Sequence, residues 1–254
     1  MKGFLEEYGL IIVVVAVILL MLLFGKSGYA KSIQDAILGS ANHIVETGEN
    51  ITKKDKITAS DTIDIEGAKY VVLEERENNQ ALVMTASSIG NKAFQSDDRL
   101  DGQNQNTYEG SEIDNYLENE WYNGLSSTMK AAIQTTSIKQ ASYSSSSIDD
   151  KQETGYNGQV YNTISRHAFL PSVSELEKVV DLKIYTDNAK AFLNGTNIWT
   201  RDSSQRYDYD AKYLDARYGC LSSNVVWIKY GMRPAFVIDL SKVDYKVAGH
   251  TDYK

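Results

Sequence analysis

The residues best suited to do chemistry lie in segment 201–229, RDSSQRYDYDAKYLDARYGCLSSNVVWIK, where tyrosines alternate with aspartates and arginines. A tyrosine offers a large contact area for two torsion angles, and an arginine offers a forked set of donors. This mixture is typical of a surface that binds a protein or a glycan. The alternative is a polar-edged β surface that only shields the core. The predicted ligand-binding residues are Arg201, Arg206, Tyr207, Tyr209, Asp210, Tyr213, Asp215, Arg217, Tyr218 and Lys229.

Catalysis and metal binding find little support in the residue types. Cys220 is the only cysteine, so it can form neither an intrachain disulfide nor a cysteine-based metal site. Asp208 and Asp210 alternate, but no glutamate follows at a position that would close a calcium loop. Ser165 lies near a histidine but lacks a nucleophile-elbow pattern. The three histidines have no partner at ligand spacing: His43, His167 and His250. We therefore predict no catalytic residue, no metal site and no cofactor.

The charge balance argues against nucleic-acid binding. The formal net charge is -8 and the sequence pI is about 5.0. Apart from Lys53-Lys54, the chain has no cluster of lysine or arginine that could follow a phosphate backbone. Tyrosine outnumbers phenylalanine by 17 to 6, so much of the aromatic area carries a hydroxyl and tolerates contact with water.

An apolar run near the amino terminus must position everything that follows. Residues 8–24 hold no charged side chain and, at about 1.5 Å per residue, would form a helix of roughly 26 Å, at the short end of what crosses a bilayer. We expect residues 8–24 to bind the membrane. A cleaved secretory signal is the competing interpretation, but Glu6 and Glu7 outnumber Lys2 where such a signal needs positive charge.

A second helical pattern follows the apolar run. Ile33, Ile37, Ala41 and Ile44 recur at helical spacing, and Thr47-Gly48 supplies a stop. We expect residues 1–49 to form the transmembrane and amphipathic part, 50–60 a polar neck, and 61–254 one ligand-binding domain.

The first 25 residues resemble a known family. The segment Glu7-Tyr8-Gly9-Leu10-Ile11, followed by aliphatic residues, is similar to the Flp/Tad type of pilin. This resemblance implies cleavage after Gly3 and a homo-oligomer or filament built through the N-terminal helix. It also implies an alternative, structural function as a minor pilin or conjugation-associated filament subunit. A plain membrane anchor remains open as well.

The rest of the chain shows both strand and helix signals. Apolar runs bounded by Glu66-Gly67 and Asn78-Asn79 predict an antiparallel meander. Ser172 and Glu175 have the spacing of a capping box and predict the start of a helix. The expected strands are 62–65, 69–74, 80–85, 224–230 and 234–240, and two further helices are expected at 111–122 and 127–135. This pattern predicts an α+β fold with short antiparallel strands and two or three helices.

Three motifs carry a second resemblance: FLPSVSELEK at 169–178, IWTRDSS at 198–204 and YGMRPAFVIDL at 230–240. They resemble a functionally undefined family of bacterial surface domains with the C-type-lectin-like fold, which formylglycine-generating enzymes and the variable proteins of diversity-generating retroelements share. The resemblance implies that Trp199 and Trp227 fill the core and that buried carbonyls or a carboxylate hold Arg233. It also implies that 201–229 faces the ligand, and it leaves open whether this segment is genetically diversified. Formylglycine-generating enzymes work with a cysteine pair, which this chain lacks.

These observations together predict a membrane-anchored, surface-displayed protein whose C-type-lectin-like domain lies outside the cell. We expect an adhesin or receptor that binds a protein or a glycan through the 201–229 face. We expect it to be neither an enzyme nor a nucleic-acid-binding protein.

Overall fold

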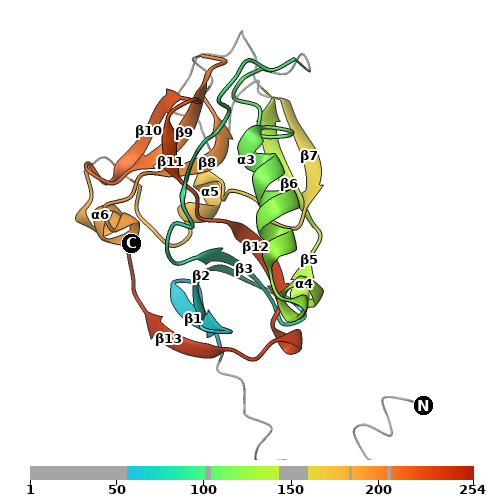
Figure 1. Ribbon diagram of the computed structural model, residues 1–254. Coiled ribbons are helices and arrows are strands. Elements are labelled where there is room, and N and C mark those ends of the chain that lie inside the picture. The colour runs from blue at the N-terminus through green and yellow to red at the C-terminus, as the bar shows by residue number, and fades with distance from the viewer. Residues whose placement is uncertain (1–55, 101–103, 143–159, 183–184, 205–206) are drawn as a thin grey trace, which may run out of the picture. The chain divides into compact units, whose positions relative to one another are not determined.

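Strands dominate the part of the chain that the computed structural model describes, residues 56–100, 104–142, 160–182, 185–204 and 207–254. Strands hold 40% of these residues and helices 19%. The expected α+β, C-type-lectin-like head is therefore wrong, because the fold is mostly β with a few short helices (Figure 1). None of the described helices has the length and apolar character needed to span a membrane. The predicted membrane and amphipathic segments, 8–24 and 27–46, lie outside the described residues.

A six-stranded antiparallel sheet forms one layer, in the order β13-β1-β2-β3-β12-β5. The predicted meander is confirmed, because its two turns place Glu66-Gly67 and Asn78-Asn79 at positive φ, as a two-residue hairpin requires. The strands are β1 (Asp61–Ile65), β2 (Ala68–Arg76), β3 (Gln80–Thr85), β5 (Ile133–Gln134), β12 (Ala235–Asp239) and β13 (Lys246–His250).

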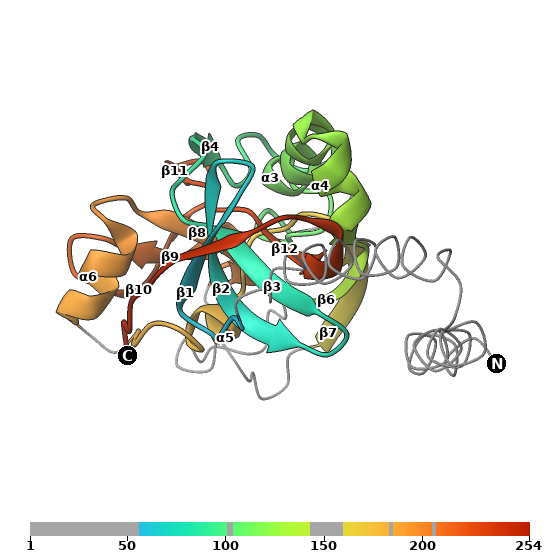
Figure 2. The same cartoon turned by 90° about the horizontal axis from the view of Figure 1, so that it is seen from below.

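The central strands of this sheet are buried on both faces. In β3, Leu82 and Met84 belong to one apolar cluster, while Ala81 and Val83 belong to another. Successive side chains point to opposite faces of a strand, so each face has its own core. Helix α4 (Ser127–Ala132) contributes to the smaller core, and α6 (Asp187–Leu193) lies at the opposite side of the fold (Figure 2).

A five-stranded sheet, in the order β10-β9-β8-β11-β4, shares the larger core. Trp199 lies at its centre without solvent exposure, and its ring lies 5.9 Å from Phe94 and 4.8 Å from Tyr230. The core placement predicted for Trp199 is confirmed. The strands are β4 (Asn91–Ala93), β8 (Ile198–Ser203), β9 (Asp210–Asp215), β10 (Cys220–Val225) and β11 (Lys229–Gly231).

Two predictions for the 224–230 segment are wrong. The segment is not one strand, because β10 ends at Val225 and a turn closed by the Ile228 N–H to the Val225 carbonyl (3.1 Å) precedes β11. Trp227 lies in this turn and is exposed rather than in the core. The segment holds no glycine or proline, so no local signal marks the turn.

The helices are shorter and less regular than expected. The predicted helix at 111–122 begins at the Ser111 cap but divides into α3 (Glu112–Asn115), the π-helix η1 (Tyr116–Trp121) and the 3-10 helix η2 (Tyr122–Gly124). The capping box of Ser172 and Glu175 is confirmed. The remaining helices are α5 (Val173–Leu176) and η3 (Leu240–Lys242). The stretch stays helical throughout, but its hydrogen-bond pattern changes along its length.

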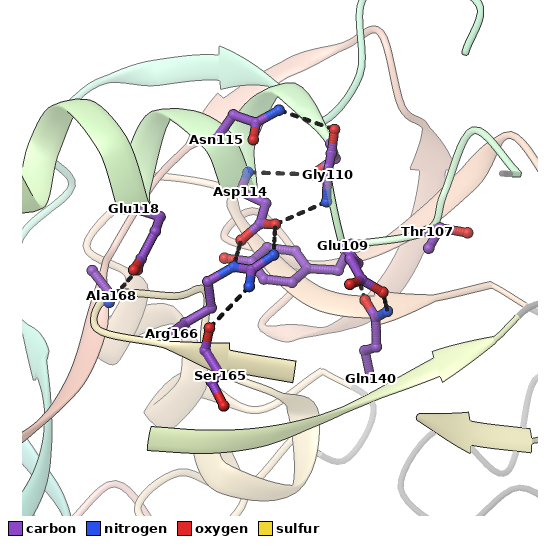
Figure 3. A network of polar contacts seen from close by, with 12 residues as sticks. Thr107, Glu109, Gly110, Asp114, Asn115, Glu118, Gln140, Ser165, Arg166 and Ala168 are labelled. Carbon is purple, nitrogen blue, oxygen red and sulfur yellow. Dashed lines mark hydrogen bonds and ion pairs between the residues drawn. The ribbon is translucent and has the colours of Figure 1, made fainter. Parts of the chain in front are cut away.

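A two-stranded hairpin that the sequence did not predict completes the described fold. Strands β6 (Thr136–Ser142) and β7 (Val160–Arg166) pair along seven positions. Figure 3 shows how the hairpin is attached: Arg166 donates two hydrogen bonds to the buried Asp114 of α3, at 2.8 and 2.7 Å. Gln140 also bonds the Glu109 carboxylate at 3.1 Å. The buried positions of β6 include the polar residues Thr136 and Gln140, so β6 lacks the alternation of apolar and polar residues that predicts a strand.

Arg233 has the structural role that its motif implied. The Nε atom donates to the Thr85 carbonyl at 2.7 Å and Nη1 donates to the Phe192 carbonyl at 3.2 Å. Burial lowers the pKa of the Arg233 guanidinium to about 10. The expectation that buried carbonyls hold this side chain is confirmed.

Candidate functional site

Three exposed aromatic side chains meet at one end of the β9–β10 hairpin. Tyr207 and Tyr209 precede β9 and Trp227 follows β10, and their exposed fractions are 40%, 37% and 52%. The rings of Tyr207 and Tyr209 are stacked at 5.1 Å and 13°, and the Trp227 ring lies 6.1 Å from that of Tyr209 at 33°. We call these three residues the aromatic cluster. Adjacent large rings left in water are the usual mark of a contact surface.

A buried asparagine supports the aromatic cluster from below. Asn106 has no solvent exposure, and its Nδ2 lies within hydrogen-bond distance of three carbonyl oxygens: Ser204 at 3.0 Å, Tyr207 at 2.9 Å and Asp210 at 2.8 Å. The Asn106 N–H also donates to the Asp208 carbonyl at 2.9 Å. One side chain therefore holds the backbone on both sides of the two exposed tyrosines.

Backbone hydrogen bonds hold the turn that carries Trp227. The Val226 N–H donates to the Tyr209 carbonyl at 2.9 Å, and the Gln95 N–H donates to the Val226 carbonyl at 3.1 Å. Val226 itself is buried in the larger core. The aromatic cluster is thus presented from backbone that the core fixes on two sides, which reduces the entropy lost on binding.

The structure does not bring the ten predicted ligand-binding residues to one surface. Arg201 and Tyr213 are buried, and Arg206 lies outside the described residues. Tyr207 and Tyr209 are exposed, whereas the half-buried Asp210 lies behind them, with its carbonyl bonded to Asn106. The described members of the ten therefore do not form one continuous exposed face.

The remaining predicted residues lie elsewhere on the five-stranded sheet. Asp215, Arg217 and Tyr218 belong to the tip of the β9–β10 hairpin, where the Asp215 carboxylate accepts the N–H groups of the other two. Six-residue strands separate this tip from the aromatic cluster by roughly 17–20 Å. Lys229 begins β11 and lines an open cavity of about 620 Å³. In an antiparallel hairpin, residues at the open end lie a full strand length away from residues at the tip.

A second exposed aromatic pair marks the hairpin tip. The rings of Tyr218 and Tyr185 meet edge to face at 5.8 Å. The neighbouring Gly219 has φ +66°, and a Cβ there would lie 2.1 Å from the Thr186 carbonyl oxygen. The tip is therefore packed closely against the start of α6. These two tyrosines provide a natural comparison for the aromatic cluster.

A buried charge network lies beneath the sheet, at Arg201. Both Nη atoms of Arg201 bond the Glu175 carboxylate, at 2.6 and 2.7 Å. Burial alone would raise the pKa of Glu175, but the Arg201 guanidinium outweighs it and the pKa is lowered. Burial also raises the pKa of Asp202, to about 6, because Arg201 offsets it only in part. The Arg201 guanidinium thus stabilises the charged form of Glu175 more than that of Asp202.

Because the pKa of Asp202 is raised, the difference in stability between the wild type and Asp202→Asn should depend on pH. A carboxyl group whose pKa is higher in the folded than in the unfolded state stabilises the fold below its unfolded pKa, and this contribution is lost as the pH rises through about 6. We expect the free energy of unfolding of Asp202→Asn, relative to wild type, to rise by about 2 kcal/mol between pH 4.5 and 7.5. Urea unfolding across this range measures it, and a constant difference would contradict the assignment.

A histidine chain near η1 has the connectivity of a hydrolytic triad. His167 Nδ1 lies 2.7 Å from Glu118 Oε1, and His167 Nε2 lies 2.9 Å from Thr135 Oγ1. However, Glu118 Oε2 also accepts the backbone N–H groups of His167 and Ala168, and Thr135 is exposed to water. Figure 3 shows Glu118 directed at the Ala168 N–H. We infer that these contacts fix the backbone where the chain leaves β7.

Two residues of the site escaped prediction. Trp227 was expected in the core because the resemblance to the lectin-like family implied it, and its exposure depends on the turn between β10 and β11. Asn106 lies in the polar segment 97–110, where no periodicity distinguishes it from its neighbours. Only the spatial approach of that segment to β9 gives Asn106 its role.

Comparison with known proteins yields one match. A family described as a domain of unknown function (DUF6273) matches residues 78–240. No curated protein and no solved structure matches the chain.

Proposed function

The chain belongs to the DUF6273 family, and from this starting point we propose that it is a membrane-anchored, surface-displayed protein that binds a partner protein through the aromatic cluster. One observation carries the proposal: Tyr207, Tyr209 and Trp227 expose adjacent rings, and the buried Asn106 holds the backbone that carries the two tyrosines. Tyrosine and tryptophan are the residues that most often dominate the energy of protein contacts.

The arrangement of the rings favours a protein over a glycan. Because Tyr207 and Tyr209 are stacked at 13°, each ring covers part of a face of the other, so less of each flat face is open to a ligand. The exposed Asp208 between them adds a carboxylate that can accept hydrogen bonds. Stacked aromatic rings and a carboxylate match the mixed polar and apolar surface of a protein. A flat, open ring face would be the better match for a sugar.

Display at the surface is supported by the sequence of residues 8–24. Seventeen residues without a charged side chain, Tyr8 to Phe24, are an adequate anchor at about 1.5 Å per residue. The polar neck after residue 49 would separate the binding domain from the bilayer. Protease digestion of intact cells tests this part: the domain should be degraded from outside, and full protection would contradict display.

The binding test uses the full-length chain displayed on cells, applied to arrays of extracellular proteins and of glycans. We expect retention on a protein target and at least tenfold weaker retention, about 1.4 kcal/mol, when Tyr207, Tyr209 and Trp227 are together replaced by alanine. The matched control is Tyr185→Ala with Tyr218→Ala, which removes the other exposed aromatic pair.

Three outcomes decide the proposal. Retention that survives the triple substitution contradicts a role for the aromatic cluster. Equal losses in the triple variant and the control would mean that exposed aromatic area in general, rather than this cluster, causes retention. Binding to glycans alone would refute the protein partner.

A further inference from the structure

Three chain segments meet around a polar cavity of about 620 Å³ at the Gly231 end of β11. They are the loop 88–91, the turn 195–197 after α6, and β11 itself. In the sheet, Gly231 lies opposite Asn91 on one side and pairs with Ile198 on the other, so β11 holds the two flanking segments together. The volume falls within the range of small-molecule sites, about 300–1,000 Å³.

Gly231 allows the walls of this cavity to approach closely. A Cβ at Gly231 would lie 2.8 Å from Ser88 Oγ and 2.8 Å from Thr196 Cγ2. At Gly90 and Gly195, by contrast, a Cβ would have no neighbour within 4 Å. The cavity therefore has a tight floor at Gly231, and no side chain narrows it at Gly90 or Gly195.

The polar groups that line the cavity are available to a ligand. Lys229 is exposed and forms no ion pair with any described residue. Across the described chain, the side chains of Asn91 and Thr196 have no hydrogen-bond partner either. The cavity thus combines one unpaired ammonium group with an amide and a hydroxyl.

The aromatic residue beside the cavity points away from it. Tyr230 lies between Lys229 and Gly231 in β11, and successive side chains point to opposite faces of a strand. The Tyr230 ring instead stacks on Tyr213 at 4.4 Å and lies 4.8 Å from that of Trp199. Tyr230 therefore borders the cavity with its backbone, and the side chains offered to a ligand are those of Lys229, Asn91 and Thr196.

We propose that this cavity binds an acidic sugar, a pyranose ring that carries one carboxylate. The Lys229 ammonium pairs with the carboxylate, and Asn91 and Thr196 hydrogen-bond the ring hydroxyls. A single lysine matches a monoanion better than a phosphate with nearly two charges, particularly on a chain of net charge -8. The site is separate from the aromatic cluster and does not depend on the function proposed there.

The test measures binding of D-glucuronate and of D-glucose to the full-length chain in lipid nanodiscs by saturation-transfer NMR. We expect glucuronate to bind and glucose to bind at least tenfold more weakly. Lys229→Gln should weaken glucuronate binding at least tenfold, while Lys229→Arg should retain most of it. Lys246→Gln on β13, which removes another exposed lysine, is the matched control and should leave binding unchanged.

The opposite results are equally clear. Equal binding of glucose and glucuronate, or equal effects of Lys229→Gln and Lys246→Gln, would overturn the role of Lys229. Competition by acetate as strong as that by glucuronate would overturn recognition of the sugar ring. Absence of glucuronate binding by the wild type would overturn the proposal. Loss of the aromatic cluster should not change glucuronate binding, so the two proposals can fail separately.

Discussion

Replacing Arg201 with methionine should lower the free energy of unfolding by about 3–5 kcal/mol. The guanidinium joins three elements: it bonds Glu175 in α5, the Leu170 carbonyl at 3.0 Å and the Lys139 carbonyl of β6 at 2.9 Å. Methionine fills much of the same volume but leaves the Glu175 carboxylate buried without its cation. The penalty comes mainly from that uncompensated charge. Equilibrium urea unfolding of the full-length chain in detergent measures it.

Two controls separate this cause from a general loss of packing. The double variant Arg201→Met/Glu175→Gln removes the unpaired charge but keeps an acceptor for the Ser172 N–H, so it should be more stable than Arg201→Met alone. Lys178→Met breaks the exposed pair with Glu74 and should change stability by less than about 1 kcal/mol. If the double variant is as unstable as the single one, the buried charge is not the cause.

Replacing Asn106 with aspartate should have an effect of similar size, at least about 3 kcal/mol. The side chain keeps its shape, but the Nδ2 group that donates to the carbonyls of Ser204, Tyr207 and Asp210 becomes an oxygen. A buried carboxyl group then faces three carbonyl oxygens with at most one proton to share. We expect the backbone beneath the aromatic cluster to lose its support.

Amide hydrogen exchange locates this effect. The N–H groups of Ser204, Asp210 and Val226 are bonded within the supported region and should exchange faster in Asn106→Asp, as binding through the aromatic cluster weakens. Asn115→Asp, which alters an exposed asparagine with one bond to the Gly110 carbonyl, is the matched control and should change stability by about 1 kcal/mol or less. Unchanged exchange in Asn106→Asp would show that other contacts hold the cluster.

Features governed by neighbours in the chain could be predicted from the sequence. The turns at Glu66-Gly67 and Asn78-Asn79 follow from residue types that tolerate positive φ, and the meander follows from the turns. The Ser172 and Glu175 capping box is likewise a matter of four consecutive residues. Trp199 and Arg233 were assigned to the interior from the motifs that contain them, and both are buried.

Features that depend on contacts between distant parts of the chain could not be predicted from the sequence. The helical stretch at 111–122 was predicted, but its division into α, π and 3-10 turns was not, because an apolar stripe indicates a buried face and not the hydrogen-bond pattern of the backbone. The β6–β7 hairpin was missed because buried polar residues such as Gln140 find their partners only in the folded chain.

For the candidate site, the sequence by itself determined that segment 201–229 is rich in tyrosine, and that lysine and arginine do not cluster beyond Lys53-Lys54. Only the tertiary structure decided which tyrosines reach the surface together. Tyr207 and Tyr209 meet Trp227 because β9 and β10 pair antiparallel, and the same pairing carries Tyr218 to the other end. The physical reason is that exposure is set by which strands pair and what packs on them, and no local pattern of residues encodes those partners.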